Sequence, residues 1–137
     1  MKRYYIVEGD KTTANGIDLY APVGTPVRAM ADGVVIAVYA FYAGTHAVEI
    51  RHSKHIVRYG EVRSNSIKVK PGDKVVRGQI IAGVGKLHGI KNSMLHLEMY
   101  SNINDTSSLT VKGSKGGIYK RRNDLINPTP FIEKADF

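Results

Sequence analysis

The sequence predicts an all-β fold, and three observations favour it. Fourteen glycines and five prolines punctuate the 137 residues, as is typical of short strands joined by tight turns. Several apolar runs alternate with polar residues in a period of two, whereas no stretch of ten or more residues shows a convincing period of 3.6. The content of 42% hydrophobic and 23% charged residues is ordinary for a globular domain.

The predicted strands lie between turn signals along the chain. Residues 22–26, Pro-Val-Gly-Thr-Pro, form a turn because proline fixes φ and glycine supplies a positive φ. Residues 46–52 and 56–62 show the clearest in–out alternation, which is typical of half-buried strands. The expected strands cover residues 17–19, 27–29, 34–39, 46–52, 56–62, 75–76, 80–84 and 95–100.

Residues 101–137 are expected to form a loop and a closing tail. The polar, glycine-containing stretch at 102–117 predicts a long loop. Residues 124–132 carry apolar side chains and two prolines, which predicts a segment with one helical turn that docks on the core. Since neither an internal repeat nor a linker divides the sequence, we expect residues 1–137 to form a single domain.

Composition and charge narrow the function. The chain has no cysteine, so any metal site must use His, Asp or Glu. The net charge of +8 fits a bacterial wall with anionic polymers or simply a solubilising surface. We expect no nucleic-acid partner, because the basic residues are scattered apart from 120–122. No apolar run approaches the ~20 residues of a membrane span, and residues 1–10 lack a signal-peptide core.

Four residues are candidates for a polar site. His96 and Glu98 are residues i and i+2 of a strand and therefore share one face. Asp18 lies in an apolar strand, where a buried carboxylate is costly unless it is paired or bound to metal, and Glu61 has the same character. Spacing alone leaves His96 open to a core or surface role, Asp18 to a turn and Glu61 to a solvated strand end. Glu98 is expected to accept a hydrogen bond rather than bind metal. The other histidines are expected to be surface or structural: His46, His52, His55 and His88.

Three motif blocks resemble the lysostaphin/LytM-like peptidoglycan endopeptidases. Residues 15–35 resemble the family block H-x-G-x-D with a-P-x-G-T-P-V and a-x-G-x-V. Residues 70–82 resemble its G-D-x-V-x-x-G-Q-x-I-G turn, and residues 95–98 match the second half of its H-x-H-x-E strand. The resemblance implies a compact antiparallel β-sheet groove or sandwich with zinc at its floor. It also implies cleavage of peptidoglycan peptides.

The same resemblance assigns roles to individual residues. Asp18 and His96 fall on two of the three zinc ligands of the family. Ala14 stands where the third ligand, the His of H-x-G-x-D, is expected, and Met94 replaces the first His of H-x-H. Glu61 replaces the histidine of a tyrosine-x-His motif, as in one branch of the family. Because a carboxylate can take a proton from a zinc-bound water, we expect Asp18 and His96 as metal ligands and Glu61 as the general base.

The alanine at position 14 leaves several functions open. The first is a peptidoglycan-directed zinc metalloendopeptidase domain. The second is an inactive pseudo-peptidase that binds cell-wall peptide or a protein partner, and the third is a structural domain of a secretion or phage-like particle.

The amino-terminal segment suggests a delivery route. Residues 3–16 resemble the opening of PAAR-repeat proteins, the spike tips of type VI secretion. The resemblance implies that residues 1–16 are atypical for the peptidase family, and that the protein is a secreted antibacterial effector with a type VI spike component as partner. The chain would then be made in the bacterial cytoplasm and act in the periplasm or cell wall.

Overall fold

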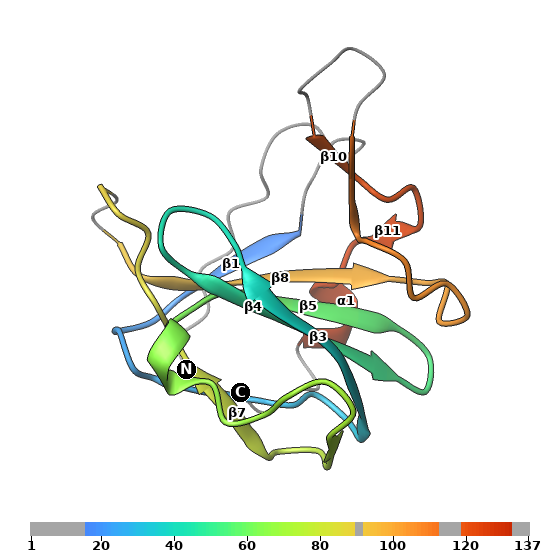
Figure 1. The fold of residues 1–137 in the computed structure, drawn as a ribbon, viewed down its shortest axis with the longest axis horizontal. Helices are drawn as coiled ribbons and strands as arrows, with labels where there is room; N and C mark the ends of the chain where they lie inside the picture. Colours follow the sequence, from blue (N-terminus) through green and yellow to red (C-terminus); the bar gives the residue numbers. More distant parts are fainter. Residues whose placement is uncertain (1–15, 90–91, 113–118, 133–137) are drawn as a thin grey trace.

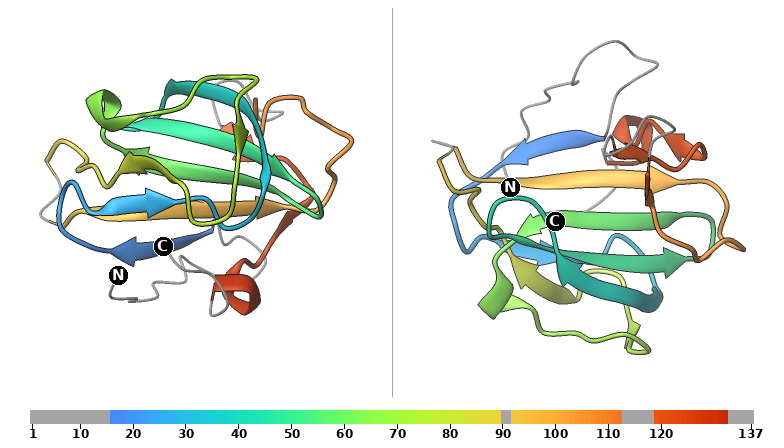
Figure 2. Two further views of the ribbon diagram at one scale, coloured as in Figure 1. Left: turned by 90° about the horizontal axis from the view of Figure 1, so that it is seen from below. Right: turned by 45° about the horizontal axis from the view of Figure 1, so that its top comes forward.

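Two antiparallel sheets stack on each other in the computed structural model, which describes residues 16–89, 92–112 and 119–132 (Figure 1). The strands of the main sheet are β1 (Ile17–Tyr20), β3 (Gly33–Ala40), β4 (His46–His52), β5 (Ile56–Val62), β6 (Lys74–Val75), β8 (Met94–Tyr100) and β11 (Leu125–Ile126). Their order is β1-β8-β5-β4-β3-β6, and β11 also pairs with β8. The second sheet pairs β2 (Pro26–Arg28) with β7 (Ile80–Gly83) and lies against one face of the main sheet (Figure 2). The predicted all-β fold class is confirmed.

The hydrophobic core fills the space between the two sheets. Alternate residues of each strand of the main sheet point into this space, because successive side chains of a strand face opposite sides. The small sheet contributes Val27, Ile81 and Ala82. The residues that the main sheet contributes include Ile17, Leu19, Val48, Ile50, Val57, Tyr59, Leu95 and Leu97.

The other face of the main sheet, here called the outer face, is divided into an apolar and a polar part. Ile56, Tyr100 and Leu109 form a small buried cluster there, with Leu125 packed against it. The chain after β8 thus covers one part of the outer face with apolar side chains. The strand residues that remain on this face include charged groups, and these build the candidate site.

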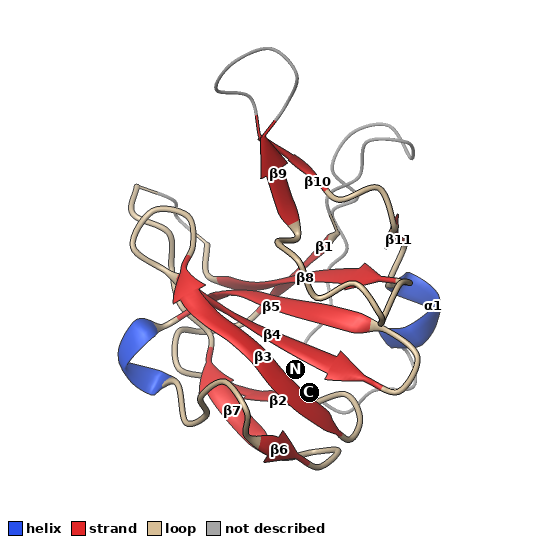
Figure 3. Ribbon diagram, turned by 45° about the vertical axis from the view of Figure 1, so that its right-hand side comes forward, coloured by secondary structure: helices blue, strands red, loops and turns tan. Residues whose placement is uncertain are grey.

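A short hairpin corrects the prediction for the C-terminal region. β9 (Thr110–Lys112) pairs with β10 (Tyr119–Arg121) and projects beside β8 (Figure 3). The expectation of a loop over residues 102–117 is therefore wrong at β9. Three strand residues give too short an alternation to be distinguished from a loop in the sequence.

Within the described residues, the helical content is limited to single turns. A 3₁₀ turn, η1, covers Ser64–Ser66, and α1 covers Thr129–Ile132, which confirms the helical turn predicted near the C-terminus. The Phe131 ring of α1 packs edge-on against His55, with 4.7 Å between ring centroids. None of the helices in the described ranges is long and apolar enough to cross a membrane.

A buried hydrogen-bond chain holds Tyr59 of β5 in the core. The Tyr59 hydroxyl donates to Nε2 of His52 (2.9 Å) and accepts from the Met30 amide (3.0 Å). The other ring nitrogen of His52, Nδ1, donates to the carbonyl oxygen of Asp32 (3.0 Å). His52 therefore has a structural role, as expected, and burial lowers its pKa.

Replacing Tyr59 by phenylalanine tests this chain. The Tyr59→Phe variant leaves Nε2 of His52 and the Met30 amide without their hydrogen-bond partner. Its free energy of unfolding should therefore be about 1–3 kcal/mol lower than that of the unmodified protein. Urea denaturation measures the difference. The exposed Val76 supplies the control: Val76→Ala should change the free energy of unfolding by at most about 0.5 kcal/mol. Equal effects of the two variants would contradict the structural role of the Tyr59 hydroxyl.

Candidate metal centre

Three neighbouring strands bring the predicted site residues together on the outer face. β8 lies between β1 and β5, and in its register His96 is opposite both Asp18 of β1 and Gly60 of β5. One ligand atom from each of Asp18, Glu61 and His96 lies within 4.8 Å of the others. All three residues are buried, with at most 7% of their surface exposed. The structure thus unites all three residues that the sequence predicts for the site.

A β-bulge in β5 positions Glu61. His46 of β4 is opposite Val62 and Val48 is opposite Tyr59, so three residue steps on β5 match two on β4. Glu61 takes up the extra length with a φ of 62°, in the left-handed region that side chains other than glycine rarely adopt. Tyr59 and Val62 remain in the core, whereas Glu61 joins Asp18 and His96. Bulges of this kind re-aim side chains next to active sites.

Two carboxylates flank the imidazole of His96. Nδ1 lies 2.7 Å from Oδ1 of Asp18, and Nε2 lies 2.8 Å from Oε2 of Glu98. Burial by itself would lower the pKa of His96, but the hydrogen bonds to Asp18 and Glu98 raise it to about 10. The metal-free imidazole is therefore cationic at neutral pH and donates to both carboxylates.

Glu98 is the centre of a larger ion-pair network. Its fully buried carboxylate pairs with Nε of Arg58 (3.3 Å) and Nε of Arg121 (3.1 Å) and accepts a hydrogen bond from the Tyr100 hydroxyl. Burial would raise the pKa of the Glu98 carboxyl, but the hydrogen bond from His96 and the neighbouring positive charges hold it below its usual range. Glu98 thus accepts a hydrogen bond from His96, as expected.

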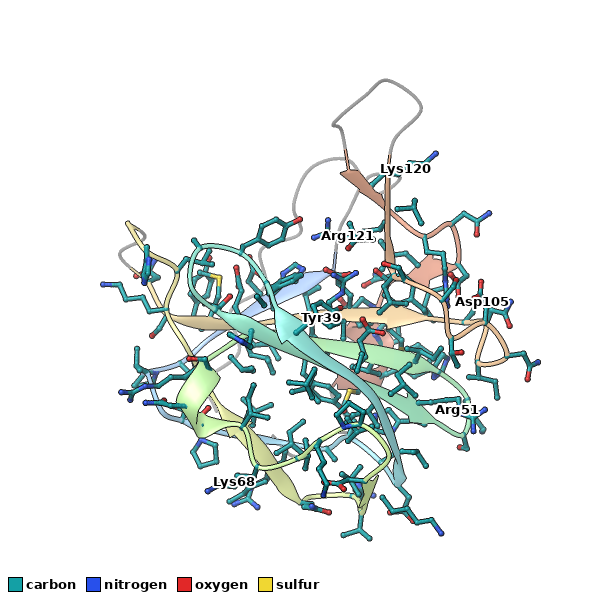
Figure 4. All side chains as sticks on the ribbon, in the orientation of Figure 1. Tyr39, Arg51, Lys68, Asp105, Lys120 and Arg121 are labelled. Atoms are coloured by element: carbon teal, nitrogen blue, oxygen red, sulfur yellow. The ribbon has the colours of Figure 1, made fainter. Side chains whose placement is uncertain are left out.

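Both arginines of the basic run 120–122 pair with carboxylates of the same chain. Arg121 reaches from β10 to Glu98 and to the Tyr42 hydroxyl (2.9 Å). Figure 4 shows Arg121 above the sheet, whereas Lys120 points away from it. Arg122 is buried and pairs with Asp124 (2.6 Å). Of the three, only Lys120 is exposed.

Phe41 covers the site from the loop between β3 and β4. Its ring stacks on His96 with 6.2 Å between centroids, and Cζ of Arg58 lies 5.1 Å from its centre. This close approach needs Gly60, because a Cβ atom there would come within 2.8 Å of the Phe41 ring. Phe41, Arg58 and Arg121 were not predicted from the sequence as parts of the site. A signal existed for Arg58, which is a charge in an alternating strand just as Asp18 is.

The sequence departs from the family pattern at Ala14 and at Met94, and the structure describes only Met94. Ala14, like nearly all of the PAAR-like opening, lies outside the described residues. Gly16 approaches β8 so closely that a Cβ atom would come within 2.2 Å of the Leu97 carbonyl oxygen. Met94 is buried on β8, two residues before His96, and therefore on the same face. Its thioether cannot exchange protons as an imidazole can.

The donors in this cluster suit a zinc ion. An imidazole and two carboxylates are nitrogen and oxygen ligands of the kind that zinc accepts, and a catalytic zinc needs three of them. Nε2 of His96 is held by Glu98, so Nδ1, which faces Asp18, is the nitrogen that would bind metal. A metal-binding histidine usually donates its other N–H to a carboxylate in this way.

Residues 12–108 match the Peptidase family M23. The chain belongs to this family. It is 34% identical over 124 residues to the peptidoglycan DD-endopeptidase ShyA of Vibrio cholerae, covering 90% of this chain and 26% of that protein. It is 32% identical over 123 residues to the glycyl-glycine endopeptidase ALE-1 of Staphylococcus capitis, covering 89% of this chain and 30% of that protein. The chain therefore spans about a quarter of the length of these curated relatives.

Solved M23 structures share the fold. The catalytic domain of lysostaphin from Staphylococcus simulans superimposes with a TM-score of 0.66 at 23% identity, over 96% of this chain and 88% of that domain. A zinc-containing peptidase from Vibrio cholerae superimposes with a TM-score of 0.62 at 28% identity, over 74% of this chain and 34% of that protein. The β-rich fold is thus that of the lysostaphin-type domains.

Two substitutions at Glu61 separate its backbone from its side chain. A residue other than glycine in the left-handed region costs about 1–2 kcal/mol, and both variants remove the carboxylate. The Glu61→Gly protein should therefore be more stable than Glu61→Ala by about 1 kcal/mol. Thermal or urea unfolding in the presence of a metal chelator measures the difference. If Glu61→Ala is equally stable, the bulge conformation stores no strain.

Proposed function

We propose that this domain is a zinc-dependent endopeptidase that cleaves peptides of the bacterial cell wall. The observation that supports the proposal is the meeting of Asp18, Glu61 and His96 on three adjacent strands of an M23 fold. Asp18 and His96 pair with each other in the metal-free protein, and Glu61 lies close to both. One imidazole and two carboxylates form a set of nitrogen and oxygen donors that zinc accepts.

Each side chain has a role in this proposal. Asp18 and Nδ1 of His96 hold the metal, and Glu98 fixes the orientation of the His96 ring through Nε2. Glu61 lies close enough to these ligands to accept the proton of an attacking water, which is the role of a general base. A zinc ion bound here supplies a Lewis acid that polarises the scissile carbonyl and lowers the pKa of water.

The substrate class rests on the relatives and on charge. ShyA is a peptidoglycan DD-endopeptidase and ALE-1 a glycyl-glycine endopeptidase, so peptide bonds of peptidoglycan are the proposed target. The net charge of +8 would favour binding to a wall that carries anionic polymers. The role of antibacterial effector, carried by a type VI spike to the periplasm or wall of a target cell, is a further proposal that rests on residues 3–16 alone.

Zinc content and wall hydrolysis test the function together. The purified protein should contain about one zinc ion per chain by elemental analysis, should solubilise isolated peptidoglycan, and should lose this activity with a chelator. The Ala14→His variant is the reference, because it restores the donor that the family carries at this position and should bind zinc more tightly.

The outcomes separate the candidate functions. Hydrolysis that persists in the presence of a chelator would rule out the zinc mechanism. Zinc in the Ala14→His variant but none in the unmodified protein would favour the pseudo-peptidase, and a peptidoglycan pull-down would then separate a wall-binding domain from a structural part of a secretion particle.

The hydrogen bond between His96 and Glu98 predicts a partial loss of zinc affinity when Glu98 is replaced. The Glu98→Gln substitution removes the charge that holds Nε2–H and should weaken zinc binding by about 10–100-fold. Competition with a chromogenic zinc chelator measures it. The control is Asp124→Asn, which removes a carboxylate bound to Arg122 instead. Equal zinc affinities of the two variants would show that Glu98 does not orient the ligand.

A further inference from the structure

The number of metal donors is the open chemical question at this site. Asp18 and His96 supply two, whereas a catalytic zinc is usually held by three protein ligands and keeps one open position. Two donors alone would bind zinc far more weakly. The histidine that supplies the third ligand in the family is replaced by Ala14, and an alanine side chain cannot bind a metal ion.

We propose that Glu61 is the third protein ligand of the metal ion. The proposal rests on the zinc-dependent function proposed above and changes the part that Glu61 plays in it. It is carried by geometry: Glu61, Asp18 and His96 each offer a ligand atom within 4.8 Å of the other two. Tetrahedral zinc with bonds of about 2.0–2.1 Å places neighbouring donors about 3.3–3.4 Å apart. Rotation about the side-chain bonds of Glu61 can bring its carboxylate closer to the donor atoms of Asp18 and His96.

The backbone supports the same assignment. Without the bulge in β5, a regular alternation after Tyr59 would place residue 61 on the core face, together with Tyr59. The bulge instead places Glu61 with Asp18 and His96, at the cost of a left-handed conformation that suits glycine. Strained residues of this kind cluster at active sites and ligand clamps. The three donors also lie on paired strands rather than on loops, which gives a metal site a rigid frame.

A ligand role does not remove the capacity for proton transfer. A carboxylate has two oxygens, so Glu61 can bind the metal through one and accept a hydrogen bond or a proton at the other. Loss of hydrolysis in a Glu61 variant therefore cannot distinguish a ligand from a base. Metal affinity can, because a residue that acts only as a base contributes little to it.

The experiment measures zinc affinity in four proteins by competition with a chromogenic chelator. These are the unmodified chain, Glu61→Gln, Glu61→Gly and the control Glu49→Gln. Glu49 is a buried glutamate on neighbouring β4 that is hydrogen-bonded to Tyr39 and lies outside the donor cluster. Glu61→Gly relieves the left-handed conformation, so it keeps the test valid if Glu61→Gln folds poorly.

The expected result is one zinc ion per unmodified chain, an affinity at least 100-fold lower in both Glu61 variants, and little change in Glu49→Gln. The 100-fold threshold lies at the upper end of the roughly 10–100-fold losses that follow from changing a supporting residue alone. Cobalt substitution adds a second readout, because loss of a ligand changes the visible absorption of the bound ion.

The inference and the proposed function fail in different ways. If Glu61→Gln binds zinc as tightly as the unmodified chain but no longer hydrolyses peptidoglycan, Glu61 is a base only, so the inference is wrong and the proposed function stands. If zinc binding depends on Glu61 but the unmodified chain hydrolyses no peptidoglycan, the inference stands and the function is wrong. An unmodified chain that binds no zinc overturns both.

Discussion

The buried carboxylate of Glu98 is the constraint on which the outer face depends. A fully buried charge is costly to desolvate, and only well-placed partners of opposite charge make it tolerable. Arg58 comes from the neighbouring strand, Arg121 from the β9–β10 hairpin and His96 from the same strand. Satisfying one carboxylate therefore fixes the hairpin against the sheet and also sets which nitrogen of His96 faces Asp18.

The order of the strands converts this network into a site. Because β8 lies between β1 and β5, a residue near the middle of β8 has a partner on each side, and His96 has Asp18 on one side and the Gly60–Glu61 bulge on the other. The core face of β1 and β8 is apolar, with Ile17, Leu19, Leu95, Leu97 and Met99, so the polar residues of these two strands gather on the outer face. The alternation of side chains along these strands thus places apolar residues in the core and the metal donors on the outer face.

The sequence predicted the elements whose signal is local and repeated. Strands such as 46–52 and 56–62 alternate over seven residues, and the observed β4 and β5 have these bounds. Asp18 and His96 could be singled out because a charged or polar group within an apolar strand needs a reason, and the family resemblance supplied the roles. The pairing of Arg58 and Arg121 with Glu98 could not be predicted, since it depends on strand order and on a hairpin with strands of three residues. The left-handed φ of Glu61 was equally hidden, because a bulge is defined by two strands and not by one.

The residues at positions 14 and 61 are best understood together. The resemblance gives a histidine at each, one as ligand and one near the reacting water, whereas this chain has Ala14 and Glu61. Histidine adopts the left-handed region several times more often than most side chains, so a glutamate in the bulge is the less favourable choice for the backbone. The advantage of a glutamate at position 61 is chemical. Its carboxylate provides a negative charge and two oxygens beside His96, whereas the imidazole of a histidine would provide a neutral nitrogen. A negative donor is the kind of group that a site with one fewer histidine needs, because zinc is a dication and ligand charge adds to its binding. With Glu61 as the proposed third ligand, the strained glutamate would compensate for the alanine, and the two departures from the family pattern would be one exchange of ligands within the same sheet.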